Sequence, residues 1–230
     1  SDAKNKLVEY GGSDTYELGL NKTREGYPIN SYFAYVYDGV VKDQADLDAY
    51  KKLEGVPSNI GIGDAKFKDL NGDGKISTYG DKEGDDGDAK YVGSTIPRYT
   101  FGLNLGAKWN NFDISVFFQG VAKRTLFREG EFSMPWSDWW RYPPQFYYGQ
   151  TWNEDRQDAY YPRLTHGDIR HWNYQASTMQ KINAAYVRLK NIQIGYTLPK
   201  SLLQKIGIER TRFYVSGQDL FEIHGEIGRA

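Results

Sequence analysis

Apolar and polar residues alternate most strictly in two adjoining stretches near the middle of the chain. Residues 99–109, YTFGLNLGAKW, carry an apolar side chain at every second position, with small or polar residues between. A period of two indicates a β-strand whose two faces meet different surroundings. The apolar phase continues in residues 112–121 after the two-residue turn Asn110-Asn111. The pattern predicts an antiparallel hairpin in which Trp109 faces Phe112 across the two strands.

A second pair of strands is expected towards the end of the chain. The segment AAYVRLKNIQIGYTL alternates in the same way, but the apolar phase slips near Lys190-Asn191. A β-bulge, or an upper half that leaves a membrane, explains such a slip. A short helical linker is expected over 200–208, and RTRFYVSGQDLF is the next strand.

The remaining regions are less periodic. Residues 27–41 are aromatic and β-branched and indicate strand, and residues 43–53 have helical spacing with Asp43 as the cap. We therefore divide the chain into a strand and acidic loop region (27–98), a hairpin (99–121), a long aromatic loop (122–183) and a strand pair (184–222).

The long aromatic loop changes the interpretation of the strands. It holds five of the six tryptophans and shows little periodicity. An unstructured stretch of this length is unusual in a compact soluble domain, whereas outer-membrane barrels alternate long outer loops with tight turns and place aromatic girdles at the interfaces. A membrane-crossing strand of a barrel needs about 9–11 residues. The expected fold is all-β, with antiparallel strands of part of a transmembrane β-barrel, long extracellular loops and a short helix or two.

Composition narrows the possible chemistry. Cysteine is absent, so disulfides and thiolate sites are excluded. The three histidines lack the spacing of a zinc hydrolase. The net charge of -1 lacks the basic excess that usually marks nucleic-acid binding. No catalytic residue is assigned, and we expect a protein that is not an enzyme.

One acidic stretch has the start of a calcium-binding loop. Asp69, Asn71 and Asp73 place side-chain oxygens at alternate positions, Gly74 makes the turn, and the carbonyl of Lys75 adds a further oxygen. The twelfth position, where a bidentate glutamate is expected, holds Gly80. A weak calcium site and a plain turn built on aspartate and asparagine side chains both remain open.

The long loop also carries a candidate binding cluster. Its rings suit contact with a partner protein, stacking on a substrate, or packing against one another as a small loop core. The members are Trp136, Trp139, Trp140, Tyr142, Tyr147, Tyr148 and Trp152.

A series of motifs resembles the SusC/RagA family of TonB-linked outer-membrane transporters. Five stretches match family motifs in order, and the resemblance covers nearly all of residues 26–221. The stretches are GYPINSYFAYVYDGVV, GDAKFKDLNGDGKI, VGSTIPRYTFGLNLGAKWNNFDISVFFQGV, and AYVRLKNIQIGYTLP followed by RFYVSGQDLF.

The resemblance implies a large barrel with an N-terminal plug, a SusD-like surface lipoprotein as partner, and energy supplied through TonB. It implies import of glycans or peptides across the outer membrane of a Gram-negative, Bacteroides-like cell. This sequence lacks the family's plug, its TonB-contacting segment, most of its strands and its last strand. We therefore expect the chain to be the C-terminal part of a longer barrel.

A second function remains open from the residues themselves. A secreted, calcium-dependent carbohydrate-binding β-sandwich would also be all-β, aromatic-rich and free of disulfides. The outward face of residues 99–118 separates the two, because it meets lipid in a barrel and forms a core in a sandwich. A glycoside hydrolase would need a carboxylate pair flanking the bond, and the sequence shows none on strand ends.

Overall fold

A computed structural model describes residues 5–9, 21–22, 25–78, 87–128, 132–135, 143–204 and 207–225. The chain separates into two units. The sheet unit comprises the described residues of 97–124 and 183–225, and the loop unit comprises those of 5–96 and 125–182. No helix in the described part has the length and apolar character needed to span a membrane.

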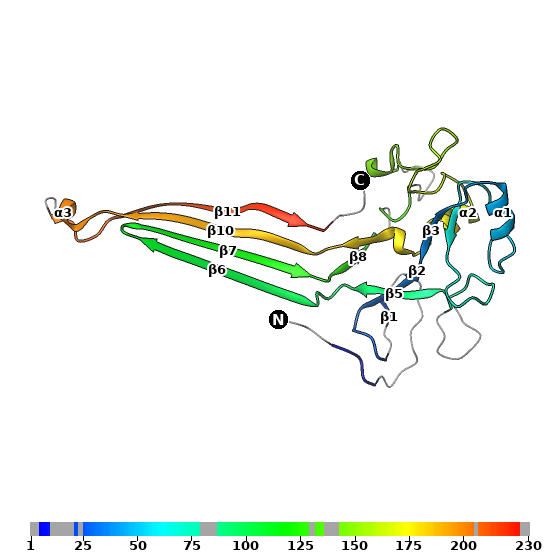
Figure 1. Ribbon diagram of the computed structural model, residues 1–230, viewed down its shortest axis with the longest axis horizontal. Coiled ribbons are helices and arrows are strands. Elements are labelled where there is room, and N and C mark those ends of the chain that lie inside the picture. Colours follow the sequence, from blue (N-terminus) through cyan, green and yellow to red (C-terminus); the bar gives the residue numbers. More distant parts are fainter. Residues whose placement is uncertain are drawn as a thin grey trace. The chain divides into compact units, whose positions relative to one another are not determined.

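The sheet unit is a four-stranded antiparallel sheet in the order β11-β10-β7-β6 (Figure 1). Its strands are β6 (Tyr99–Trp109), β7 (Phe112–Ala122), β10 (Tyr186–Thr197) and β11 (Arg212–His224). Trp109 pairs with Phe112, and Asn110 has a φ of 50° in the turn between them. The predicted hairpin and its register are therefore confirmed. The linker between β10 and β11 contains helix α3 (Lys200–Leu203).

The expected irregularity in the second strand pair is a β-bulge. The register of β10 shifts between Leu189 and Asn191, both where it pairs with β7 and where it pairs with β11. Asp219, on the neighbouring strand, has a φ of 50°, which a non-glycine residue adopts only in special turns and bulges. The bulge restores the apolar phase, because Leu189 pairs with Phe118 and Ile192 with Val116.

The two faces of this sheet differ in chemistry. The apolar phase of all four strands faces one side, called here the outer face, and many of its side chains are exposed. The most exposed are Leu103, Leu105, Trp109, Phe112, Ile194, Phe213, Val215, Leu220, Phe221 and Ile223. The inner face carries Asp113, Gln193 and Arg212, which are joined by hydrogen bonds. Phe117, an exception to the alternation, lies on the inner face against Gly102.

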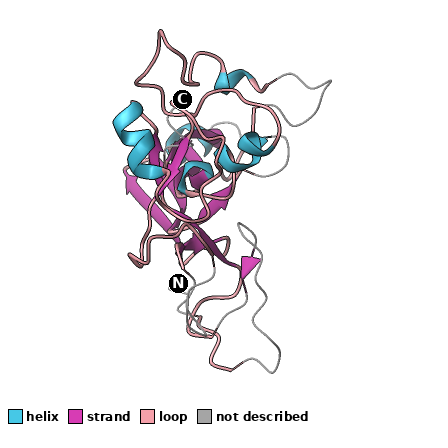
Figure 2. Cartoon of the chain, turned by 90° about the vertical axis from the view of Figure 1, so that its right-hand side faces the viewer, coloured by secondary structure: helices cyan, strands magenta, loops and turns pink. Residues whose placement is uncertain are grey.

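The loop unit is built from short elements (Figure 2). Strands β1 (Asn21–Lys22), β2 (Ser31–Tyr35) and β5 (Ala89–Ser94) form one sheet, and β3 (Tyr37–Val40) pairs with β4 (Ala65–Phe67). A further pair is β8 (Thr125–Phe127) with β9 (Lys181–Asn183). The helical elements are α1 (Gln44–Tyr50), α2 (Asp168–Asn173) and the 3-10 turns η2 (Gln145–Tyr147) and η3 (Thr178–Gln180).

Local sequence explains where helix α1 begins. The side chain of Asp43 accepts a hydrogen bond from the backbone N–H of Asp46 at 2.9 Å, which satisfies one of the free donors of the first turn. Leu47 and Tyr50 are buried on one side of the helix. The predicted helix and its aspartate cap are confirmed.

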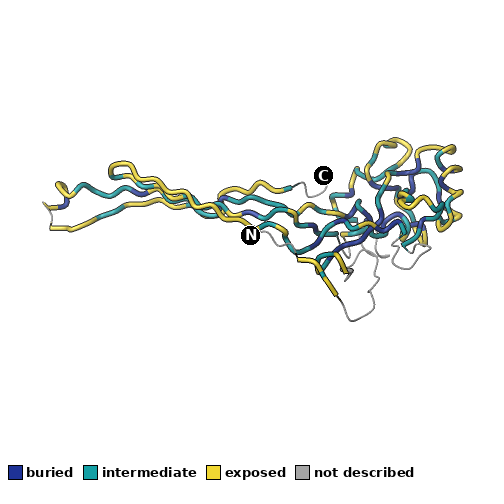
Figure 3. Tube along the Cα trace, turned by 60° about the horizontal axis from the view of Figure 1, so that its bottom comes forward, coloured by how far each residue is buried: buried dark blue, intermediate teal, exposed yellow. Residues whose placement is uncertain are grey.

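The loop unit buries its apolar residues in two larger clusters. One gathers Val41, Ile60, Phe67 and their neighbours around helix α1. The other gathers Tyr147, Tyr161, Tyr174 and Met179 from the long aromatic loop. Figure 3 shows the contrast, with buried segments concentrated in this unit and the long strands exposed or half-buried.

Strands dominate the described residues and helices are few and short, which confirms the all-β character. The described strands form four separate sheets, and none of these sheets closes on itself as a barrel.

Candidate functional site

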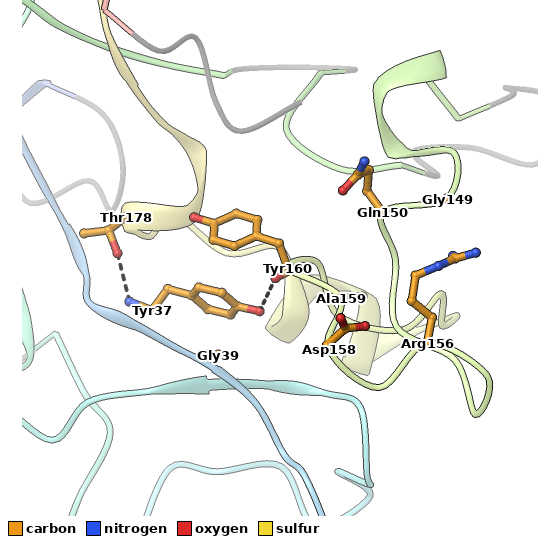
Figure 4. A pocket seen from close by; sticks show the side chains of 9 residues that line it. All are labelled: Tyr37, Gly39, Gly149, Gln150, Arg156, Asp158, Ala159, Tyr160 and Thr178. Atoms are coloured by element: carbon orange, nitrogen blue, oxygen red, sulfur yellow. Dashed lines mark hydrogen bonds between the residues drawn. The ribbon is translucent and has the colours of Figure 1, made fainter.

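The candidate site is a hollow of 670 Å³ in the loop unit, called here the Arg156 hollow (Figure 4). Three segments line it: β3, the loop 149–160 and the start of η3. The lining residues are Tyr37, Gly39, Gly149, Gln150, Arg156, Asp158, Ala159, Tyr160 and Thr178.

Hydrogen bonds across long sequence separations fix the walls of this hollow. The hydroxyl of Tyr37 donates to the backbone carbonyl of Tyr160 at 2.7 Å, and the backbone N–H of Tyr37 donates to Oγ1 of Thr178 at 3.0 Å. The rings of Tyr37 and Tyr160 meet edge to face at 5.7 Å. Burial, followed by the neighbouring Tyr160 and Tyr161, raises the pKa of the Tyr37 hydroxyl, so this group stays a neutral donor.

Two charged side chains line the same hollow without a partner of opposite charge. Arg156 makes one long side-chain hydrogen bond, from Nη1 to the carbonyl of Thr151 at 3.4 Å. In the described part of the chain, neither Arg156 nor Asp158 forms an ion pair. A guanidinium has five N–H donors, so most donors of Arg156 are available to a ligand.

A second, smaller hollow of 340 Å³ shares Gly149 and Arg156 with the first. Its other lining residues are more apolar and include Pro143, Tyr147, Tyr148 and Leu164. Tyr148 is 89% exposed and Leu164 is 51% exposed. Arg156 therefore lines both a hollow of mixed polarity and a more apolar one.

A buried ion pair fixes the outgoing end of the loop that carries these residues. Asp64 is fully buried, and Arg163 donates to both of its carboxylate oxygens, at 2.7 and 2.9 Å. Asn173 also donates to Asp64, at 2.9 Å, and accepts from the backbone N–H of Ala65 at 2.8 Å. This network ties residue 163 to the loop before β4 and to helix α2.

The predicted aromatic cluster is divided by the structure. Trp136, Trp139, Trp140 and Tyr142 lie outside the described residues. Tyr147 is buried against Tyr161 and Tyr174, whereas Tyr148 is exposed beside the apolar hollow. Trp152 covers Gly63, whose φ of 86° and lack of a side chain allow the indole ring to approach its backbone. Tyr148 is thus the described member that is most open to a partner or substrate.

The predicted calcium loop folds as a turn held by its own side chains. Asp69 accepts from the backbone N–H groups of Gly72 and Gly74, at 2.6 and 2.9 Å. Asp73 accepts from the N–H of Lys75 at 2.8 Å. In the described part of the chain, no group of three or more histidine, aspartate or glutamate side chains is arranged to hold a metal ion.

Asp88 closes this turn, although the twelve-residue spacing does not include it. Its carboxylate accepts from the backbone N–H groups of Leu70, at 2.6 Å, and Ser77, at 2.9 Å. Burial raises the pKa of Asp88, the two amides oppose that effect, and the charges of Asp69 and Asp73 add to it. The three carboxylates therefore lie close enough for their negative charges to influence one another.

Sequence reasoning did not single out Arg156, Asp158 and Tyr160. Their segment, NEDRQDAYY, mixes charged and aromatic residues in the way that many exposed loops do. The hollow forms only because the chain brings residue 37 next to residues more than one hundred positions away.

Comparison with known proteins links the chain to one class of receptor. It is 30% identical to TonB-dependent receptor P3 of Formosa agariphila over 205 residues, which are 86% of this chain and 18% of that protein. It is 27% identical to TonB-dependent receptor P26 of the same organism, over 96% of this chain and 22% of that protein. The chain therefore spans about a fifth of the length of these relatives. No family model matches the sequence.

Solved structures share the fold. The structure of the RagAB peptide transporter matches 95% of this chain and 22% of its own, with a TM-score of 0.66 and 20% identity. The RagAB peptide importer in its open-open state matches 96% of this chain, with a TM-score of 0.61 and 22% identity.

Proposed function

We propose that this chain forms part of an outer-membrane transporter, because it is similar to TonB-dependent receptors in sequence and to the RagAB transporter in fold. Both similarities support its resemblance to the SusC/RagA family. In this proposal the sheet unit contributes barrel strands and the loop unit contributes extracellular loops. The relatives named above are receptors and transporters, which agrees with the expectation of a protein that is not an enzyme.

The observation that carries the proposal is the exposed apolar face of the sheet unit. A soluble protein rarely exposes a large contiguous apolar surface, yet Trp109, Val215 and Ile223 are each at least 66% exposed. Successive residues of each strand point alternately to this apolar face and to the polar inner face. Barrel strands show the same pattern, with apolar residues towards lipid and polar residues towards the lumen. The strands contain 11 to 13 residues, which suffices to cross a bilayer at the tilt of a barrel.

The finer parts of the proposal concern partners and cargo. The cargo is an oligosaccharide or a peptide, and a SusD-like surface lipoprotein assists its capture. The rest of the barrel, its plug and TonB act through regions outside this sequence. Tyr148 supports the partner role, since an exposed tyrosine beside a hollow is the kind of residue that dominates binding interfaces.

A calcium ion in the loop around Asp69 is a separate structural proposal. Asp69, Asn71, Asp73 and the carbonyl of Lys75 are the expected ligands. The side-chain oxygens already accept hydrogen bonds from backbone amides, so the affinity should be weak.

Cell fractionation tests the proposed function against the carbohydrate-binding module. The full-length polypeptide that contains this segment should be found in the outer membrane, should change its gel mobility on heating, and should support uptake only when TonB is present. A polypeptide released into the medium that binds glycans with calcium and needs no detergent would favour the secreted module instead.

A further inference from the structure

We propose that the Arg156 hollow recognises a carboxylate group on the transported molecule. The inference rests on the proposed function and adds to it the chemical class of the cargo. The guanidinium of Arg156 is the recognising group. The expected ligand has a carboxylate, hydrogen-bond donors next to it, and an apolar ring or chain face.

Arg156 has unused capacity to donate hydrogen bonds and to pair with a negative charge. Its side chain is half-buried, and its one side-chain hydrogen bond within the described part of the chain, to the carbonyl of Thr151, is 3.4 Å long. That carbonyl does not neutralise the charge. The contrast is with Arg163 in the same loop, whose guanidinium is paired at both ends with Asp64. A planar guanidinium can bind a carboxylate or a phosphate through two parallel hydrogen bonds, so Arg156 is suited to an anionic group on the ligand.

Asp158 lines the same hollow as Arg156 and adds a negative charge to it. A phosphate or sulfate monoester places its charge on a tetrahedral group, and a phosphate carries close to two negative charges that Asp158 would repel. A singly charged carboxylate suffers less repulsion. Asp158 can then accept a hydrogen bond from a hydroxyl or N–H next to that carboxylate, and the side chain of Gln150 can donate or accept.

The smaller hollow, which Arg156 also lines, offers an apolar surface beside the guanidinium. Tyr148 and Leu164 line the smaller hollow and are exposed, and the ring of Tyr160, which is 42% exposed, borders the larger one. Flat aromatic surfaces favour a ligand with an apolar ring or chain face beside its charge. Uronic-acid residues of a glycan and the C-terminal residue of a peptide both combine these features.

Matched probe pairs distinguish the two sources. Calorimetry on the full-length receptor in detergent would compare trigalacturonate with its methyl ester, and tetra-alanine with its C-terminal amide. Each neutral form loses the negative charge of the carboxylate, through an ester in the first pair and an amide in the second. We expect the acid form of one pair to bind about tenfold tighter or more than its neutral form, in line with the strength of charge-assisted hydrogen bonds.

Variants assign that preference to the hollow. Arg156→Gln should abolish the preference for the acid form, and Arg156→Lys should keep part of it because the charge remains without the planar fork. Lys181→Gln, which removes an exposed charge outside both hollows, should leave the preference unchanged. Equal binding of acid and neutral forms, absence of binding by both acids, or an unchanged preference in Arg156→Gln would each overturn the inference.

The same receptor preparations also show whether a failure concerns the carboxylate site or the proposed function. Wild type and Arg156→Gln should both show heat-modifiable mobility, because Arg156 belongs to the loop unit and not to the strands. A wild-type receptor that does not assemble in the outer membrane contradicts the proposed function. Assembly without charge-dependent binding contradicts only the carboxylate site.

Discussion

The sheet unit and the loop unit use the same apolar residue types in opposite ways. In the sheet unit, Leu103, Val215 and Ile223 point away from the sheet and remain exposed. In the loop unit, Val41, Phe67 and Met179 are almost completely buried. The loop unit therefore has the interior of a water-soluble domain, whereas the sheet unit needs an external apolar medium or further strands to cover its outer face.

The polar groups show the complementary difference. The loop unit buries Asp64 and satisfies it with Arg163, Asn173 and a backbone N–H. The sheet unit keeps its ion pairs on the inner face, where Arg212 reaches over Gly195 to Asp113. The proposed placement of the strands in a membrane and of the loops in water accounts for both differences.

The largest expected effect is in the buried network of the loop unit. Arg163→Ala leaves the carboxylate of Asp64 buried without its counter-charge, which costs about 3–5 kcal/mol for a buried pair. We expect the lower end, because Arg163 itself is 37% exposed. Hydrogen exchange of the backbone amides in this unit, followed during denaturation of the full-length receptor, measures the loss because it reports on these residues alone.

Arg156→Ala is the matched control for this change. It removes the same side chain from the same loop, at a position without an ion pair among the described residues. Its unfolding midpoint should stay close to that of the wild type. Equal shifts for Arg156→Ala and Arg163→Ala would show that the network around Asp64 does not organise the loop unit.

The next largest effect is on the outer face of the sheet unit. Leu103→Arg should reduce barrel assembly by roughly 2–4 kcal/mol if the residue lies near the bilayer midplane. Asn104→Arg is the control, because the next residue on the strand faces the other side. Heat-modifiable mobility of the full-length protein measures assembly, and similar losses in both variants would refute the assignment of faces.

The elements that sequence could predict are those set by local pattern. The hairpin of β6 and β7 follows from a period of two and a two-residue turn, and the bulge at Lys190 follows from the slip in phase. Helix α1 follows from Asp43 and the spacing of its buried residues. In each case the information lies within about a dozen neighbouring residues.

The candidate site could not be predicted because its contacts are distant in sequence. Tyr37 and Tyr160 are separated by 123 positions, and Asp64 and Arg163 by 99. Asp88 was missed for a related reason, because a fixed twelve-residue spacing ends at Gly80 while the chain returns to the turn only later. Trp152 shows the opposite limit of sequence reasoning. It was predicted as part of a binding cluster, but its ring packs over Gly63.

A smaller effect tests the inner face of the sheet unit. A Cβ atom at residue 195 would lie 2.4 Å from Nη2 of Arg212, so Gly195→Ala should displace this side chain from Asp113. The pair is partly exposed, so its loss should lower the melting temperature only slightly. At Gly106 the same substitution meets only a backbone oxygen at 3.7 Å, so Gly106→Ala is the control. A melting temperature of Gly195→Ala equal to that of the control would contradict a stabilising role for the Arg212–Asp113 pair.

The smallest effect concerns calcium at the Asp69 turn. Calorimetry should detect weak binding, in the roughly 10⁻⁴–10⁻³ M range of extracellular sites, and Asp73→Ala should abolish it. Asp48→Ala removes an exposed aspartate elsewhere in the loop unit and serves as the control. Absence of calcium binding in the wild type would leave the turn as one held only by its own hydrogen bonds.

The central claim is that the two faces of the sheet unit meet different solvents, and spin-label accessibility tests it most directly. The chain has no cysteine, so single cysteines can be placed at successive positions of β6 in the full-length receptor and labelled in membranes. The account predicts a period of two, with labels at Leu103, Leu105 and Ala107 accessible to oxygen dissolved in lipid and those at Asn104 and Gly106 accessible to a water-soluble nickel reagent. Equal access of the nickel reagent to both sets of positions would contradict it.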